Sequence, residues 1–390
     1  MYDVLKGVRV VEVAEWMFVP AAVSILADWG ADVVKIEHPQ RGDAVRGLSH
    51  VNFLVCNRGK RSVGLDISKP QGREILEKMI AGADVFVTSL MAPARRKLGI
   101  ESDQLTAKYP RLIYARGTGH GLRGPAADKG GFDLAATWQR AGLANQMTQP
   151  GQTPPGMPGS IGDLNAGSSL AGAIAAALFR RERTGKGGVV DHSIFAAGVW
   201  MMTQSIIRNS LVPDGRPEFV GGANPLVKVY KTKDDRWIGL TFLQGDRWWP
   251  DLCRHLNRPE LAEDPRFKLQ DARAANAEAC IAELTKEFAS KTYAEWLPIL
   301  ETLEGVWAPL QNGAEVAVDP QALVNGYVTP VPSSDGAVLM ESASPGQFDE
   351  QPVGELGAAP EAWQHTEEVL LELGVDWDQI ADLQSQKVIP

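Results

Sequence analysis

The chain has 390 residues, of which 44% are hydrophobic and 22% charged, as expected for a globular protein with two domains. A formal net charge of −9 disfavours a general nucleic-acid binder and a protein that lies on anionic membranes. The N-terminus has no basic region followed by a long apolar run. The cysteines, Cys56, Cys253 and Cys280, have neither disulfide nor metal spacing, so we expect a cytoplasmic protein with reduced thiols and no metal.

Strands and helices alternate through the first part of the chain. Short apolar, β-branched runs predict strands, and longer segments with one apolar face predict helices. The expected strands are residues 8–13, 33–36, 85–87, 112–115 and 189–191, and the expected helices are residues 20–29, 70–81 and 102–108. This order predicts a large α/β domain, doubly wound and Rossmann-like, with a parallel sheet and right-handed crossovers.

Basic residues collect in three loops that follow the expected strands. Ligands bind to open α/β sheets at the carboxyl ends of the strands, where arginine forks and lysines would hold a polyphosphate. The alternative for each cluster is a solvated surface run. No GxxxxGK[ST] loop is present and no GxGxxG fingerprint follows the first strand, which counts against a nicotinamide or flavin enzyme. The basic residues are Arg41, Arg46, Arg58, Lys60, Arg61, Arg95 and Arg96.

Asp163 stands in the glycine-rich stretch of residues 159–167, just before an apolar helix expected over residues 170–178. Glycines let the backbone approach a ligand closely, and the partial positive charge of a helix N-terminus favours an ionised carboxylate. An ionised carboxylate exposed at such a turn has the properties of a nucleophile. The alternative is an ordinary helix N-cap, the commonest role of an aspartate before a helix.

The second half of the chain has a different character. After the large domain of residues 1–212 we expect a linker over residues 213–224 and a smaller α+β domain over residues 225–318. Its expected strands are residues 227–231 and 237–242, and its expected helices are residues 247–256, 274–288 and 293–303. Residues 319–390 are expected to return to the large domain, with strands at 328–331 and 337–339 and a final helix at 363–372.

Several segments together resemble the signature of the family III CoA-transferases, which include formyl-CoA transferase, carnitine-CoA transferase and α-methylacyl-CoA racemase. The Gly162-Asp163 pair with its apolar helix is the most specific of them. The others are residues 5–12, 26–37, 57–62, 180–191, 264–267, 319–321 and 365–374. Each match is weak by itself, but their order spans nearly the whole chain.

The resemblance implies a reaction as well as a fold. Asp163 would attack an acyl-CoA, and a mixed anhydride and an aspartyl-CoA thioester would follow, until a small carboxylic acid leaves as the new acyl-CoA. The three basic loops would hold CoA, which is a substrate here, and no cofactor would be bound permanently. The family also implies a homodimer of interlinked, ring-shaped subunits. Gly221 and Gly222 stand where the family has a glycine-rich lid over the nucleophile.

The residues before the nucleophile favour a transferase over a racemase. A racemase needs an acid and a base on opposite faces of the α-carbon, and racemases of this family carry a histidine and an aspartate where this chain has Phe132 and Asp133. A phenyl ring cannot carry protons, although His120 could take the missing place. The alternatives are therefore an acyl-CoA racemase or epimerase and a CoA-binding relative without catalysis.

Met17 stands where formyl-CoA transferase has a glutamine. The missing amide argues against formyl and oxalyl groups, and backbone N–H groups would have to stabilise the oxyanion. Trp16, Met17 and Phe18 together predict an apolar acyl pocket.

Overall fold

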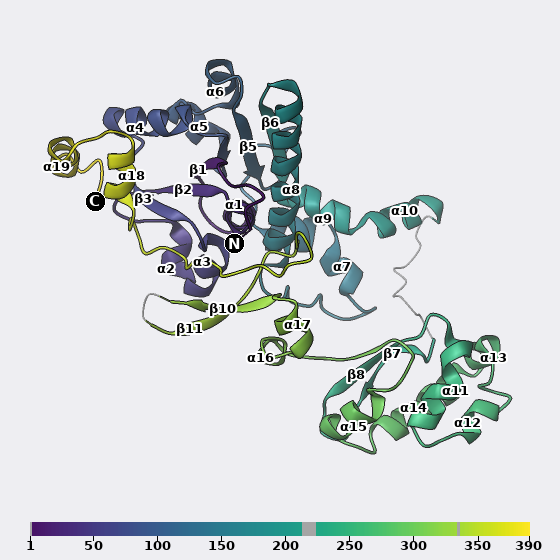
Figure 1. Cartoon of the computed structure of the whole chain (residues 1–390). Coiled ribbons are helices and arrows are strands. Elements are labelled where there is room, and N and C mark those ends of the chain that lie inside the picture. The colour runs from purple at the N-terminus through teal and green to yellow at the C-terminus, as the bar shows by residue number, and fades with distance from the viewer. Residues whose placement is uncertain (1, 213–223, 334–335) are drawn as a thin grey trace. The chain divides into compact units, whose positions relative to one another are not determined.

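The computed structural model describes residues 2–212, 224–333 and 336–390 (Figure 1). The chain divides into two compact units, Met1–Pro213 with Ala317–Pro390, and Asp214–Val316. None of the helices within the described residues is long and apolar enough to cross a membrane. The first unit therefore combines two segments that lie far apart in the sequence.

The first unit is built on a parallel sheet of six strands (Figure 1). The strands are β1 (Arg9–Val13), β2 (Asp32–Glu37), β3 (Arg61–Gly64), β4 (Val85–Thr88), β5 (Ile113–Thr118) and β6 (Gly188–Ser193). Their order is β3-β2-β1-β4-β5-β6, so β2 and β3 lie on one side of β1 and the later strands lie on the other. The predicted α/β fold with a parallel sheet is confirmed.

Alternate strand residues face opposite sides of the sheet and create two cores. On one side, Val10 and Val33 pack with apolar residues of three helices, namely α1 (Phe18–Asp28), α8 (Ile161–Thr184) and α9 (Ile194–Met201). Val11 and Val34 face the other side, where the helices are α4 (Pro70–Ala81), α6 (Ser102–Lys108), α18 (Thr366–Glu372) and α19 (Trp377–Ser385). The C-terminal segment thus completes the second core.

Shorter elements surround this sheet. They are α2 (Ala44–Leu48), α3 (His50–Asn57), α5 (Ala92–Leu98), the π-helix η1 (Leu134–Arg140), α7 (Leu143–Met147), α10 (Thr203–Leu211), α17 (Pro320–Val324) and the antiparallel pair β10 (Val328–Pro332) and β11 (Val338–Ser342).

The second unit is a smaller α+β module with an antiparallel sheet of order β7-β8-β9. Trp249 and Trp296 are completely buried in its core, as their positions in amphipathic helices predict. Its strands are β7 (Val227–Lys231), β8 (Trp237–Thr241) and β9 (Trp307–Pro309). Its helices are α11 (Gly245–His255), α12 (Glu260–Glu263), α13 (Gln270–Ala275), α14 (Ala277–Phe288), α15 (Tyr293–Leu300) and α16 (Gly313–Val316).

Helix α8 starts well before the apolar run that predicts it, and it includes Asp163. Two of the three glycines inside it, Gly162 and Gly167, stand where there is no room for a side chain. A Cβ at Gly162 would lie 2.7 Å from the Cβ of Asp133, and one at Gly167 would lie 2.9 Å from the Cβ of Ala21 in α1. These glycines therefore permit close packing, and the prediction that they form a turn before the helix is wrong.

Candidate active site

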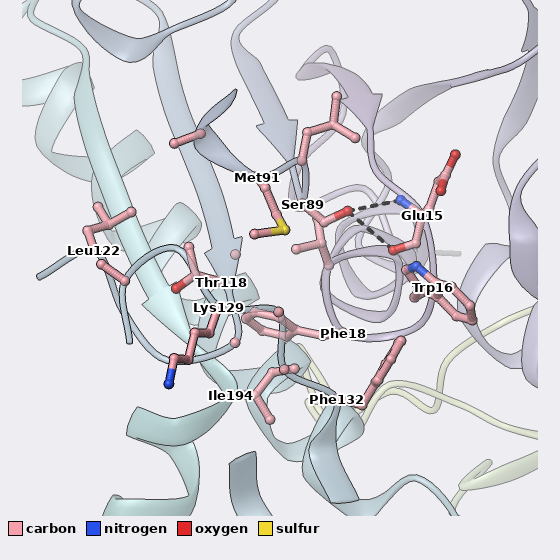
Figure 2. Close-up of a pocket in the computed structure, with 18 of the residues that line it drawn as sticks. Glu15, Trp16, Phe18, Ser89, Met91, Thr118, Leu122, Lys129, Phe132 and Ile194 are labelled. Atoms are coloured by element: carbon pink, nitrogen blue, oxygen red, sulfur yellow. Dashed lines mark hydrogen bonds between the residues drawn. The ribbon is translucent and has the colours of Figure 1, made fainter. Parts of the chain in front are cut away.

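A cavity of about 250 Å³ opens at the carboxyl ends of β1, β4 and β5 (Figure 2). β1 and β4 are neighbours. The chain adds β2 and β3 next to β1 on one side and β5 and β6 next to β4 on the other, so the strand order reverses between β1 and β4. Such a switch point leaves a crevice between adjacent loops, which is where open α/β sheets bind ligands. The position of the cavity thus follows from the topology.

Several lining residues come directly after these strands and were not predicted. Glu15 follows β1, and Ser89 and Met91 follow β4. Ser89 fixes the first loop to the second, because its hydroxyl accepts the Glu15 N–H at 3.0 Å. Their position at the strand ends is the signal that could have identified them from the sequence.

Asp163 enters the cavity from the first turn of α8. Ser160 occupies the N-cap position, so the ordinary capping role considered for Asp163 does not apply. The Asp163 residue is 8% exposed, and burial, followed by the neighbouring Asp133, raises its pKa from 3.8 to about 7. We expect an ionised, desolvated carboxylate exposed at a turn; Asp163 is indeed desolvated, but it is buried within the first turn of α8 and not exposed.

Asp133 is buried beside Asp163, at the N-cap of η1. Its Oδ1 accepts the Leu134 N–H at 2.8 Å. Burial raises the pKa of Asp133, while the backbone N–H groups of Leu134, Asp163 and Gly162 oppose this rise. Asp133 does not line the cavity itself, and its charge acts on the pKa of Asp163.

Two aromatic side chains form one wall of the cavity. The rings of Trp16 and Phe132 meet edge to face with their centroids 4.9 Å apart, and the residues are 38% and 56% exposed (Figure 2). Phe18 also lines the cavity, at the start of α1. Met17 instead packs in a separate buried cluster with Val45 and Phe53. The apolar pocket is therefore present, but the expectation that Met17 lines it is wrong.

His120 lies outside the lining of the cavity, and its ring packs against Phe195. Burial, followed by the charge of Arg140, lowers the pKa of His120. A neutral imidazole at this position does not face the substrate cavity. Gly221 and Gly222, the expected lid, lie outside the described residues.

Most of the basic residues expected to hold CoA are paired with carboxylates of the protein. Lys60 is completely buried and donates to Glu12 at 2.7 Å, and Arg58 is paired with Asp28 at the same distance. Arg46 forms two hydrogen bonds to Glu37, at 2.7 and 2.8 Å. Arg61 is paired with Asp32 and Glu372, and Arg95 is buried beside Glu101. These five cations lie in ion pairs that support the sheet and its loops.

Arg41 and Arg96 are the exposed members of the set. The Arg41 side chain is 65% exposed, and its ion pair with Glu15 has an N–O distance of 3.1 Å. Arg41 lines a second cavity of about 260 Å³ together with His38, at the carboxyl ends of β1 to β3. Glu15 and Leu90 line both cavities, which therefore adjoin each other along one edge of the sheet.

Comparisons with known proteins identify the family of the chain. Residues 5–366 match the model of CoA-transferase family III. The chain is 32% identical to (R)-2-hydroxy-4-methylpentanoate CoA-transferase of Clostridioides difficile over 99% of both chains. It is 29% identical to succinyl-CoA:glutarate CoA-transferase of Mus musculus over 95% of this chain and 86% of that one. A CAIB/BAIF family protein from Brucella suis superposes with a TM-score of 0.83 at 28% identity, over 95% of this chain and 99% of that chain. The chain therefore belongs to family III of the CoA-transferases.

Proposed function

We propose that the enzyme moves CoA from an acyl-CoA to a small carboxylic acid and that Asp163 is the nucleophile. The observation that carries this proposal is a buried carboxylate at a helix N-terminus, facing a cavity at the switch point of the sheet. Relatives named as CoA-transferases for a hydroxy acid and for glutarate support transfer to an acid.

The proposed reaction runs through two covalent intermediates. A carboxylate oxygen of Asp163 attacks the thioester carbonyl, the C–S bond breaks, and a mixed anhydride and the CoA thiolate are left. The thiolate attacks the aspartyl carbonyl, which releases the donor acid and leaves an aspartyl-CoA thioester. The acceptor carboxylate attacks this thioester to form a new anhydride, and the thiolate then takes the acceptor acyl group and restores Asp163.

The surroundings of Asp163 favour these intermediates. Burial and Asp133 both disfavour the ionised carboxylate, as its raised pKa indicates. Acylation converts that carboxylate into a neutral group and removes both penalties. A carboxylate with a raised pKa is also the more basic, and so the stronger, nucleophile once it is ionised. We infer that Asp133 raises the reactivity of Asp163 without touching the substrate.

We further propose that the second cavity holds the nucleotide part of CoA. It adjoins the first cavity, which Asp163 lines and which we call the acyl cavity. Arg41 supplies an exposed guanidinium suited to phosphate. Arg96 is exposed on the neighbouring helix α5. The five cations that are paired with carboxylates would hold in place the loops that line this second cavity.

We also propose an interlinked homodimer, which the family resemblance supports, and a cytoplasmic location, which the three widely spaced cysteines support. Apolar side chains on α9 and α10 suit such a contact, since Trp200 and Leu211 are each at least 75% exposed. The alternative of a racemase is less well supported, because the phenyl ring of Phe132 cannot act as an acid or base and His120 does not line the cavity.

Trapping the intermediates tests the proposal. Wild type incubated with an acyl-CoA and then treated with hydroxylamine or borohydride should carry a modification at Asp163, located by peptide mass spectrometry. Asp163→Ala should bind CoA, show no transfer and give no adduct. Normal transfer by this variant would remove the mechanism. Deuterium uptake at the α-carbon in D₂O without migration of CoA would instead establish the racemase, and CoA binding without either reaction would indicate the non-catalytic relative.

A further inference from the structure

The side chains around the acyl cavity are mainly apolar. Figure 2 shows Trp16 and Phe132 facing each other on one side of it, with Phe18 between them and the opposite wall. The larger apolar lining residues are Trp16, Phe18, Val19, Leu90, Met91, Leu122, Phe132 and Ile194. At roughly 30 Å³ for a water-sized group, the cavity has room for about eight such groups. This is more than a one- or two-carbon acyl group would fill.

The charges around the cavity disfavour a second carboxylate on the substrate. Asp163 lines it and repels additional negative charge when ionised, and Glu15, which also lines it, is paired with Arg41. Of the cations that line it within the described residues, Arg95 is buried, and its guanidinium donates to Leu90 O at 2.5 Å and to Glu101 at 3.2 Å. Lys129 is exposed and also lines the cavity, and in Figure 2 it lies on the side away from the aromatic pair. A carboxylate placed against Trp16 and Phe132 would therefore lose hydration beside two apolar rings.

We propose that Trp16 and Phe132 are specificity-determining residues that select apolar acyl groups, branched or aryl, over dicarboxylic ones. This inference rests on the proposed transfer reaction and names its substrate class. An aryl or branched chain would cover the exposed edge of the aromatic pair and gain apolar contact. A succinyl or glutaryl chain of similar length would place its free carboxylate on the same surface.

The buried carboxylate of Asp43 fixes the position of the Trp16 backbone. Trp16 has a φ of 72°, which is uncommon for a residue with a side chain. Its backbone N–H donates to Oδ1 of Asp43 at 3.2 Å, and Oδ2 of Asp43 lies 2.8 Å from Nζ of the fully buried Lys35. Because Lys35 is fixed in turn by Glu12, the aromatic wall has a rigid support. Asp43 is thus a positioning residue for the acyl cavity.

The test compares kcat/KM for three donors: a branched six-carbon acyl-CoA, 3-phenylpropanoyl-CoA and succinyl-CoA. Wild type should prefer the first two over succinyl-CoA by about 10- to 200-fold, the range that apolar pockets achieve. Trp16→Ala should lower this preference at least about tenfold. Phe132→Lys places a cation beside the acyl group. It should lower the preference for the apolar donors further, and its kcat/KM for succinyl-CoA should exceed that of wild type.

Exposed Trp377 on α19 provides the matched control, because it does not line the cavity. Trp377→Ala and Trp377→Lys should leave the preference of wild type unchanged. The inference is overturned if wild type uses succinyl-CoA as well as the apolar donors, or if neither Trp16→Ala nor Phe132→Lys changes the preference while transfer continues. Absence of transfer and of an Asp163 adduct with every donor would instead overturn the proposed function, and the inference with it.

Discussion

Replacing Asp163 by asparagine should stabilise the protein at alkaline pH even though it abolishes transfer. In the folded protein, burial and Asp133 raise the pKa of this carboxyl from 3.8 to about 7. When folding raises a pKa, the associated stability is fully present below the unfolded pKa and is lost as the pH rises through the folded pKa. A difference of about three between the two pKa values corresponds to on the order of 4 kcal/mol. Wild type should lose up to this free energy of unfolding between about pH 4 and pH 7.

Asparagine has nearly the same shape and no charge, so the variant should not undergo this loss. The free energy of unfolding of Asp163→Asn minus that of wild type should increase from about pH 5 to pH 7 and level off near pH 8. Urea denaturation at these pH values measures it. The exposed Asp128→Asn serves as control for the removal of a surface carboxylate. A difference that is the same at every pH would refute the argument that the protein environment penalises ionised Asp163.

The rate of transfer should rise with pH through about 7, because only ionised Asp163 attacks. In Asp133→Asn the midpoint should move to lower pH, because a neighbouring negative charge is removed; an unmoved midpoint in kcat/KM against pH would contradict this coupling. Arg41→Ala should raise KM for acyl-CoA about tenfold, as expected for one charge-assisted phosphate contact, with little change in stability. Lys60→Ala should instead lower the free energy of unfolding by about 3 kcal/mol, because it removes a buried partner of Glu12. An effect of Lys60→Ala on KM alone would place CoA at that lysine.

The central strands could be predicted because their sequences carry the signal. β1, β2 and β4 are rich in β-branched apolar residues, β5 begins with the apolar run Ile113–Ala115, and helical segments lie between these strands. β3 was missed because Arg-Ser-Val-Gly is short and begins with a charge, and only its pairing with β2 makes it a strand. Helix α19 was missed although its capping box, Asp376 with Gln379, is visible in the sequence.

The partners of the basic residues could not be predicted from their own loops. Lys60 binds Glu12, 48 residues earlier, and Arg61 binds Glu372, 311 residues later. A cluster of cations along the chain shows charge but does not show which carboxylates fold against it. The same limit applies to Asp163, whose burial depends on the packing of α8 against its neighbours and not on local sequence.

These ion pairs give the basic loops a different role from direct contact with phosphate. The Glu12 carboxylate binds both Lys60 and Lys35, at 2.7 and 3.2 Å, and Lys35 continues to Asp43. Asp43 holds the backbone of Trp16 at the wall of the acyl cavity. Buried ion pairs contribute little net stability, because the loss of hydration offsets much of their attraction, but they fix geometry when every partner is present. We therefore interpret Lys60 as one of the residues that hold Trp16 in position at the cavity. Loss of Lys60 should change the preference among acyl groups more strongly than it weakens the binding of CoA phosphates.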